Sequence, residues 1–368
     1  MRKNMQIICE SAALSSFSDT GRCGKIDPEL LREEIYMNWF VYALVCLLCW
    51  GCADLFYKKG TDEKDCYSHL KIAVWVGIMM GASSLAMLLF ACPMSIGDVL
   101  KNAVTYLPAS LGYIISMVIG YAGIRYLEMS IISPVQNASG AMTAIVLIVY
   151  YVIRGNTAGL SEEFGMPVLD ITGTVLIVIG IIALAFAEKR LADRENAMLS
   201  AAGLTEEEKK QQKKYRIGAL ALIFPLLYCL FDTVGTAADG IILDEETGLG
   251  LSEIEVLILY GFTFFLAGLG CWLYMFIRTK KPYDPFADGE MSKEIAAGFE
   301  EIGQVFYVYA MAKKPVLAAP MIAGYCIVSL LLCRLFQKEK LTRFQYACVF
   351  TVIAGILLLG ISEGIGEA

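Results

Sequence analysis

The chain alternates between long apolar runs and short polar segments, and this pattern predicts a bundle of membrane-spanning helices. A spanning helix needs about 20 apolar residues, and ten runs come close to that length. They lie near residues 38–57, 72–92, 105–124, 129–152, 169–187, 217–238, 254–277, 296–312, 316–336 and 344–362. The run at 296–312 is the most polar, because two acids and a glutamine fall in its first half. We therefore expect an all-α integral membrane protein with ten transmembrane helices.

The two halves of the chain resemble each other, which predicts an internal repeat. Residues 37–188 align with residues 217–363. Glycines coincide in the matched runs: Gly77 falls on Gly261 at an offset of 184, and Gly180 falls on Gly355. Because each unit holds five helices, an odd number, the second unit must cross the membrane in the opposite sense. We therefore expect two inverted five-helix repeats, an arrangement typical of transporters.

Two polar segments complete the predicted organisation. Residues 1–36 contain no continuous apolar run, and we expect them to be a disordered extension or a start-site artefact, with translation beginning at Met37. Residues 189–216 are rich in charges of both signs and predict a connecting loop. Each is shorter than the roughly 50 residues at which independent domains begin, so we expect function to reside within the membrane.

Composition and charge fit a membrane protein. The chain is 57% hydrophobic and 18% charged, with a mean hydropathy of +0.60, whereas soluble domains are about 25% charged. The net charge is −7, and no basic tract interleaved with aromatic residues occurs, so we expect no nucleic-acid partner. Of the 30 Lys and Arg residues, 21 fall on one side of the predicted bundle. This bias predicts a multi-pass plasma-membrane protein with both termini outside the cytoplasm.

The sequence contains no pattern typical of catalysis. His69 is the single histidine, and neither a phosphate-binding glycine loop nor a nucleophile elbow occurs. Cys46, Cys49 and Cys52 recur along one helix side, but no histidine or fourth thiol accompanies them in that run, so we expect no metal. We expect no enzymatic activity and no cofactor. A membrane-embedded lipid-modifying enzyme is the alternative, although such enzymes gather their polar residues at one interface.

Acidic residues inside the apolar runs are the strongest candidates for chemistry, because a carboxylate in hydrocarbon is costly unless paired, protonated or hydrated. Asp54 lies four residues before Lys58, so it forms either an interfacial ion pair or a proton-coupling gate. Asp232 has no basic neighbour in its run and is a second gate candidate, expected toward the opposite face. Glu300 and Glu301 are either buried proton carriers or solvated residues that precede the membrane helix.

Other polar and aromatic residues of the runs are candidates for substrate contact. Gln136 and Asn137 contact either substrate or a neighbouring helix. Gln304 shares a helix face with the acid four residues before it. The aromatic candidates, which either line a cavity or pack in the core, are Trp50, Tyr113 and Tyr307. Pro134 and Pro320 each remove a backbone donor, and the resulting bends are either hinges or static kinks.

Several short motifs carry a family resemblance. Leu47–Gly51 ends in Trp-Gly within the first run, and Tyr309–Pro315 leads into Ala318–Pro320 across a short basic turn. Lys338–Thr342 precedes the last run, which contains Gly355–Leu358. Together these motifs resemble those of the EamA-like family of ten-helix proteins in the drug/metabolite transporter superfamily. The first half departs from the family pattern: Arg154-Gly155-Asn156 stands where the family often has a glutamate, followed by an extra loop through Met166.

The resemblance covers residues 37–363 and implies a transporter that moves small metabolites by alternating access. The substrate classes it implies are amino acids, nucleobases, sugars, other small metabolites and organic cations. Because no ATP-binding motif is present, we expect secondary active transport coupled to protons through the intramembrane acids. Uncoupled facilitative exchange is the alternative. The expected partners are a small-molecule substrate, protons and the lipid bilayer.

Overall fold

The computed structural model is helical throughout the part of the chain that it describes. That part comprises residues 38–62, 65–92, 94–126, 133, 135–201, 223–244, 248–287, 289–337 and 341–366, and it contains no strand. Its helices are α3 (Trp39–Gly60), α4 (Ser68–Phe90), α5 (Ile96–Tyr126), α7 (Ala138–Arg154), α8 (Thr157–Glu163), α9 (Pro167–Ala201), α11 (Ile223–Ile242), α12 (Glu253–Thr279), α13 (Met291–Lys313), α14 (Pro315–Ala323), α15 (Tyr325–Gln337) and α16 (Arg343–Gly366). The predicted all-α class is confirmed.

Seven helical segments among the described residues are long and apolar enough to cross a membrane, which makes the chain a multi-pass membrane protein. They are Trp39–Gly60, Ser68–Phe90, Gly97–Ile124, Pro167–Leu191, Glu253–Thr279, Pro315–Phe336 and Arg343–Gly366. The other three predicted runs correspond to α7, α11 and α13. Helix α7 has only 17 residues, whereas α11 contains Asp232 and Asp239 and α13 contains Glu300, which make these two helices more polar.

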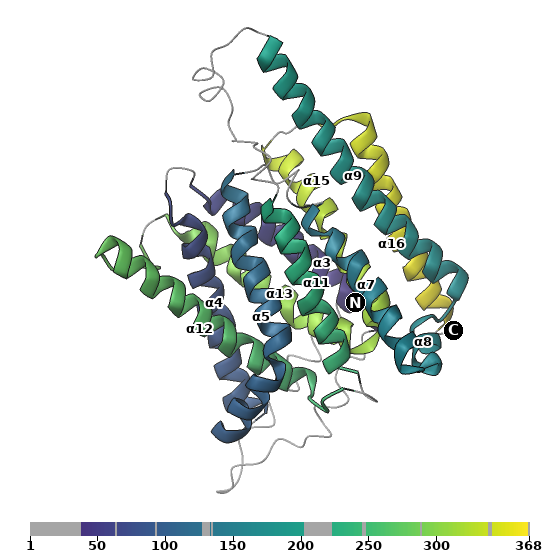
Figure 1. Ribbon diagram of the computed structural model, residues 1–368, viewed down its shortest axis with the longest axis horizontal. Helices are drawn as coiled ribbons and strands as arrows, with labels where there is room; N and C mark the ends of the chain where they lie inside the picture. Colours follow the sequence, from purple (N-terminus) through teal and green to yellow (C-terminus); the bar gives the residue numbers. More distant parts are fainter. Residues whose placement is uncertain are drawn as a thin grey trace, which may run out of the picture. The chain divides into compact units, whose positions relative to one another are not determined.

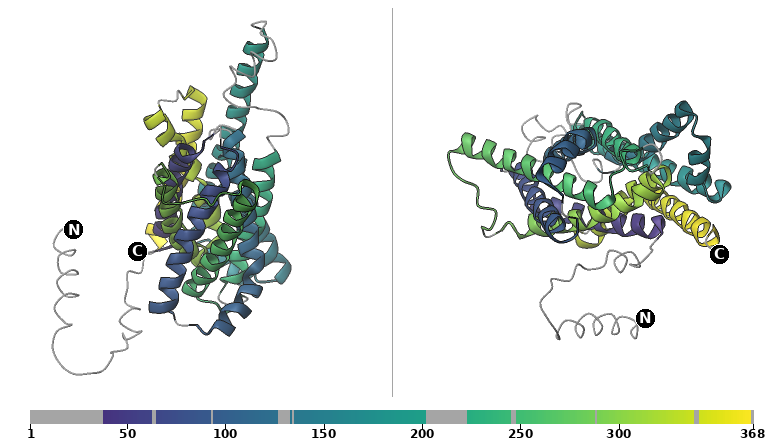
Figure 2. Two further views of the ribbon diagram at one scale, coloured as in Figure 1. Left: turned by 90° about the vertical axis from the view of Figure 1, so that its left-hand side faces the viewer. Right: turned by 90° about the horizontal axis from the view of Figure 1, so that it is seen from below.

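Each helix of the first half packs against a helix of the second half (Figure 1). The most extensive contacts join α4 to α12, α3 to α13, α5 to α11, α9 to α16 and α7 to α14. Figure 1 shows α4 and α12 at one side and α9 and α16 at the other, with α3, α5, α11 and α13 between them. The view from below in Figure 2 (right) shows the same order. The core of the protein therefore lies between the two halves of the chain.

Glycines allow the paired helices to approach closely. A methyl group added to Gly77 of α4 would lie 2.8 Å from the carbonyl oxygen of Phe264 and 3.1 Å from Cα of Gly268, both in α12. One added to Gly112 of α5 would lie 2.8 Å from Cα of Gly235 in α11. Such contacts are shorter than ordinary van der Waals separations, so a larger residue at these crossings requires the helices to move apart.

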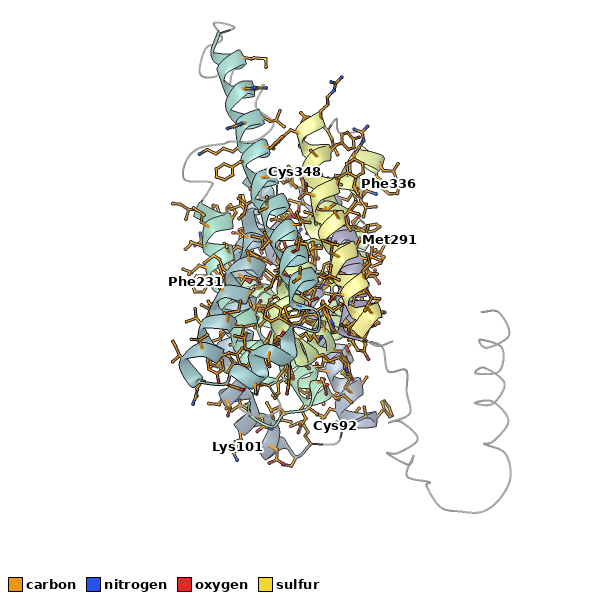
Figure 3. The ribbon with its side chains drawn as sticks, turned by 90° about the vertical axis from the view of Figure 1, so that its right-hand side faces the viewer. Cys92, Lys101, Phe231, Met291, Phe336 and Cys348 are labelled. Atoms are coloured by element: carbon orange, nitrogen blue, oxygen red, sulfur yellow. The ribbon has the colours of Figure 1, made fainter. Side chains whose placement is uncertain are left out.

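Burial separates the core helices from those at the periphery. In the most apolar stretches of α9 and α16 only 33% of residues are buried, whereas in Pro315–Phe336 the share is 83%. Large apolar side chains are exposed on outer faces, among them Phe90, Ile153, Val168 and Leu335. Figure 3 shows α9 and α16 side by side, with Cys348 and Phe336 toward one end of the bundle and Cys92 and Lys101 toward the other. These outer faces suit contact with lipid.

Two element boundaries differ from those that the sequence predicts. Helix α9 continues to Ala201, so the connecting loop expected at 189–216 begins as helix; Glu, Arg and Ala in this stretch are good helix formers. The run at 316–336 is divided between α14 and α15 at Gly324, four residues beyond the hinge candidate Pro320. Pro134, the other hinge candidate, lies outside the described residues.

Candidate functional site

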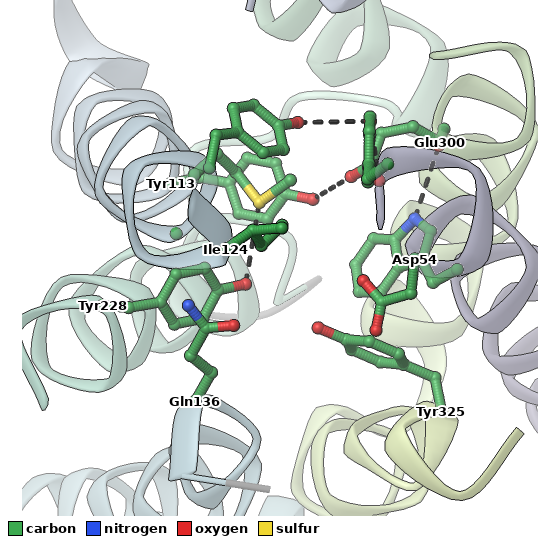
Figure 4. A pocket seen from close by; sticks show the side chains of 12 residues that line it. Asp54, Tyr113, Ile124, Gln136, Tyr228, Glu300 and Tyr325 are labelled. Carbon is green, nitrogen blue, oxygen red and sulfur yellow. Dashed lines mark hydrogen bonds between the residues drawn. The ribbon is translucent and has the colours of Figure 1, made fainter. Parts of the chain in front are cut away.

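A small cavity lies in the core between the two halves of the chain (Figure 4). Its volume is about 30 Å³, enough for about two water molecules. The polar and aromatic residues that line it are Trp50, Asp54, Tyr57, Tyr113, Tyr121, Gln136, Tyr228, Glu300 and Tyr325. Figure 4 shows Tyr113, Tyr228 and Gln136 on one side, facing Asp54 and Tyr325 on the other, with the Gln136 amide beside Tyr228. Helices α3 and α5 of the first half and α11, α13 and α15 of the second half contribute to this lining, and Gln136 lies just before α7.

A second cavity of about 30 Å³ adjoins the first. The two cavities share four aromatic residues, which are Trp50, Tyr113, Tyr228 and Tyr325. The residues that line only the second cavity include Asn137, Ser139, Asp232, Thr236 and Tyr307. The four shared side chains therefore lie between the two cavities.

Glu300 is buried in the core, with 3% of its surface exposed. The hydroxyl of Tyr113 donates to Oε1 of Glu300 at 2.7 Å, and the hydroxyl of Tyr57 donates to Oε2 at 3.4 Å. Trp50 Nε1 donates to the backbone carbonyl of the same residue at 3.3 Å. Helix α13 begins at Met291, more than two turns earlier, so the alternative that Glu300 stands in solvent before the helix is excluded.

Asp54 and Asp232 are each bound by serine hydroxyls. Asp54 accepts hydrogen bonds from Ser133, at 3.3 Å, and from Ser329. Asp232 accepts from Ser139 at 2.6 Å. Because Ser139 is in the first turn of α7, the positive end of that helix dipole favours a negative charge on Asp232. The two aspartates line adjoining cavities. Two gates at opposite faces of the membrane would instead lie far from a common site.

Asp239 is a buried acid that the sequence analysis did not single out as a site residue. It has no exposed surface, and it accepts hydrogen bonds from Tyr307 at 2.8 Å, from Tyr260 at 3.5 Å and from Tyr106. These tyrosines come from three different helices. The available signal was its spacing: Asp239 follows Asp232 by seven residues, which is two turns along one face of α11.

The remaining candidates differ in how close they lie to the two cavities. Asn137 and Tyr307 line the second cavity, and Gln136 lines the first. Gln304 is 1% exposed, and neither atom of its side-chain amide has a hydrogen-bond partner among the described residues, but it lines neither cavity. Glu301 is half-buried and bound by the hydroxyl of Ser83, away from both linings.

The two cavities are lined by carboxyl groups without basic partners. Asp54, Glu300 and Asp232 contribute side chains, and the described linings contain no Lys, Arg or His. Ion pairs occur instead near helix ends: Lys71 with Asp65, Lys293 with Glu290, and Lys314 with Glu363. A buried carboxyl group without a basic partner either carries a proton or pairs with an incoming cation. The site is therefore equipped to exchange protons or cations.

A further buried acid, Glu163, lies at the end of α8, outside the membrane-spanning segments. Its Oε2 accepts a hydrogen bond from the backbone N–H of Val316, at the start of α14, at 3.1 Å. Burial raises the pKa of Glu163 to about 8, and the Val316 bond and the charge of Lys314 offset only part of this effect. Lys314 in turn lies 3.5 Å from Glu363, near the end of α16. Glu163 lies within the predicted extra loop and was not among the candidate residues that the sequence indicated.

Comparisons with known proteins support the fold and give no function. No protein-family model matches the chain, and no curated protein matches it. A solved structure described as "Crystal structure of protein" is similar, with a TM-score of 0.55 over 88% of this chain and 96% of that chain. The two sequences are 10% identical, so the similarity concerns the fold alone.

Proposed function

We propose that this protein is a secondary active transporter that moves small organic solutes across the plasma membrane by alternating access, coupled to protons. It consists of ten spans arranged as two inverted five-helix repeats, with the substrate site between them. Asp54, Asp232 and Glu300 bind and release the coupling protons. The main support is the position of these carboxyl groups around adjoining cavities between the two halves of the chain.

The crossing of α4 and α12 supports the repeat. A methyl group on Gly77 would contact the carbonyl oxygen of Phe264, and one on Gly261 would contact the carbonyl oxygen of Met80. The sequence offset of 184 converts Gly77 into Gly261 and Met80 into Phe264. The same offset therefore converts each of these two contacts into the other. A two-fold axis that relates α4 to α12 would have this effect.

The crossing of α9 and α16 has the same property. A methyl group on Gly180 would lie 3.2 Å from the carbonyl oxygen of Cys348, and one on Gly355 would lie 2.6 Å from that of Gly173. An offset of 175 converts Gly180 into Gly355 and Gly173 into Cys348. Two separate helix pairs thus obey the internal match that the sequence predicts. Inverted repeats of this kind allow the two halves to exchange inward-open and outward-open arrangements.

The size of the cavities supports a state that is closed around the site. A volume of about 30 Å³ in each is too small for an organic metabolite. Substrate binding therefore requires a conformation in which the halves separate. The break between α14 and α15 at Gly324 lies beside the second cavity and provides a place for such movement.

Proton-coupled transport is tested with the purified protein in sealed liposomes that contain a trapped pH dye. A panel of cationic, neutral and anionic metabolites is added under an imposed pH gradient. We expect a substrate-specific change of internal pH that is lost in Asp232→Asn and kept in Asp98→Asn, an exposed aspartate outside both cavities. Substrate flux without any pH change would indicate facilitative exchange and contradict proton coupling. Absence of flux for every solute class would contradict the transporter proposal.

The distribution of basic residues supports an orientation with both termini outside the cytoplasm. An alkaline phosphatase fused after residue 366 is active only when it is exported from the cytoplasm. We expect an active fusion at this position and an inactive one in the loop between α12 and α13, which carries Lys280 and Lys281. The reverse pattern of activities would overturn the orientation.

A further inference from the structure

The four aromatic side chains shared by the two cavities form a surface that suits a cation. The ring of Trp50 stacks on that of Tyr113, with centroids 6.2 Å apart, and meets that of Tyr325 edge-on at 5.8 Å. Tyr228 completes the shared lining. The faces of Trp and Tyr rings attract cations that approach within about 6 Å of the centroid. An organic cation inserted between these rings would gain this attraction together with burial of its apolar groups.

Carboxyl groups lie on both sides of this aromatic lining. Asp54 and Glu300 line the first cavity, and Asp232 lines the second. Glu300 is 3% exposed and is held by two tyrosine hydroxyls, whereas Asp54 and Asp232, which are held by serine hydroxyls, are only half-buried. The two aspartates are therefore the acids best placed to pair with the charge of a ligand.

An unpartnered polar group also faces the first cavity. Gln136 is 5% exposed, and its side-chain nitrogen has no hydrogen-bond partner among the described residues. Figure 4 shows its amide group directed into the cavity near Tyr228. A buried donor without a partner destabilises the protein. A ligand that carries a hydrogen-bond acceptor would remove this destabilisation.

Building on the transporter proposed above, we infer that the two cavities merge on opening into one binding site for an organic ammonium ion. Its positive charge pairs with Asp54 or Asp232, and its apolar body packs between the rings of Trp50, Tyr113, Tyr228 and Tyr325. Gln136 binds an acceptor group on the same ligand. An organic anion of equal size would instead approach three carboxyl groups at close range, which disfavours its binding.

Three probes of nearly equal size and different charge test this inference. These are 2-phenylethylammonium, 2-phenylethanol and 3-phenylpropanoate, and tetraethylammonium is included as a second cation. Binding to the full chain in lipid nanodiscs is measured by isothermal titration calorimetry. We expect at least one of the two cations to bind with saturation, at least tenfold more tightly than the neutral alcohol, and we expect no binding of the carboxylate. Equal affinity for the alcohol and its ammonium analogue, or binding of neither cation, would overturn the inference.

Matched variants locate the binding site. The double variant Asp54→Asn with Asp232→Asn, and separately Trp50→Leu, are expected to weaken cation binding at least tenfold. Asp98→Asn and Trp272→Leu change the same residue types outside both cavities and are expected to bind as the unchanged protein does. Circular dichroism and gel filtration establish whether each variant folds. If Trp50→Leu does not fold, the aspartate variant alone tests the location of the site. Unchanged binding in the folded aspartate variant would place the cation elsewhere.

Binding and transport fail in distinguishable ways. Cation binding without flux in the liposome assay would contradict the transporter proposal and leave the cation site in place. Flux of a neutral or anionic solute, with no cation binding, would leave the transporter proposal in place and overturn the cation site.

Discussion

The hydroxyl of Tyr113 in α5 lies 2.7 Å from Oε1 of Glu300 in α13, and it thereby joins the two halves of the chain inside the core. The same carboxyl group faces the first cavity and is reached by Tyr57 from α3. Glu300, in the second half, is thus bonded to two helices of the first half, and both bonds must break if the halves separate there. In the proposed transporter, a change in the protonation of Glu300 would alter both hydrogen bonds between the halves and so connect proton binding with conformation.

Tyr113→Phe is expected to lower the thermal stability of the protein and to weaken proton coupling. The variant removes one hydrogen bond to a buried carboxyl group, which is worth about 1–3 kcal/mol, and leaves the longer contact from Tyr57. We expect the unfolding midpoint in detergent to fall by about 1–4 °C. Tyr274→Phe makes the same chemical change on an exposed side chain of α12 and is expected to leave the midpoint unchanged. Equal midpoints for both variants would show that the hydrogen bond from Tyr113 does not contribute to the free energy of unfolding.

Asp239 is expected to stabilise the core through its three tyrosine partners. In Asp239→Leu the hydroxyls of Tyr106, Tyr260 and Tyr307 lose a common acceptor, and each buried hydroxyl left unpaired costs about 1–3 kcal/mol. Asp239→Asn retains one acceptor oxygen. Gel filtration should therefore show little folded protein for Asp239→Leu and near-normal amounts for Asp239→Asn. Comparable yields of folded protein for both variants would assign the residue a role other than this cluster.

The sequence predicted the helices and several residues that line the two cavities, but it could not predict the tyrosine cluster around Asp239. Membrane helices follow from continuous apolar runs, and buried acids stand out within them because each is costly in hydrocarbon. The partners of Asp239 are 133, 68 and 21 residues away along the chain. No local pattern relates residues so distant, and their convergence depends on how α5, α12 and α13 pack around α11.

Gln304 is a residue whose helix face the sequence predicted but whose position relative to the cavities it did not. Its spacing of four residues from Glu300 correctly predicted a shared face of α13, yet Gln304 lines neither cavity, and its amide is buried without a partner among the described residues. Helical periodicity specifies which residues share a face. It does not specify which part of that face meets a cavity and which part meets a neighbouring helix, because that depends on the crossing of helices from the other half of the chain.

Gly261→Ala is expected to disrupt the crossing of α4 and α12. A methyl group at this position would overlap the hydroxyl oxygen of Ser84 and the carbonyl oxygen of Met80. The carbonyl belongs to the backbone of α4, so relief requires the helices to separate, at a cost of about 1–3 kcal/mol. We expect a lower unfolding midpoint and a smaller folded fraction on gel filtration. In the same helix, a methyl group on Gly270 would meet no atom within 4 Å, so Gly270→Ala should match or slightly exceed the parent. A Gly261→Ala variant as stable as Gly270→Ala would contradict close packing at this crossing.

Glu163 is expected to make the protein less stable as pH rises. Burial raises the pKa of Glu163 from its ordinary value of 4.5 to about 8, so the folded chain retains this proton over a pH range in which the unfolded chain has lost it. Because the folded state then binds more protons, the free energy of unfolding falls between about pH 4.5 and about pH 8, by up to about 1.4 kcal/mol per pH unit. Above that range the loss is complete.

The Glu163→Gln variant keeps an acceptor for the N–H of Val316 and removes the titration. Its unfolding midpoint should therefore fall less between pH 5 and pH 8 than that of the parent, by several degrees. Glu162→Gln alters the exposed neighbouring acid and is expected to retain the parental pH dependence. The comparison cancels the titration of all other groups, since they are common to the three proteins. Parallel pH profiles for Glu163→Gln and the parent would mean that Glu163 is already ionised in the folded protein, with Lys314 compensating its charge in full.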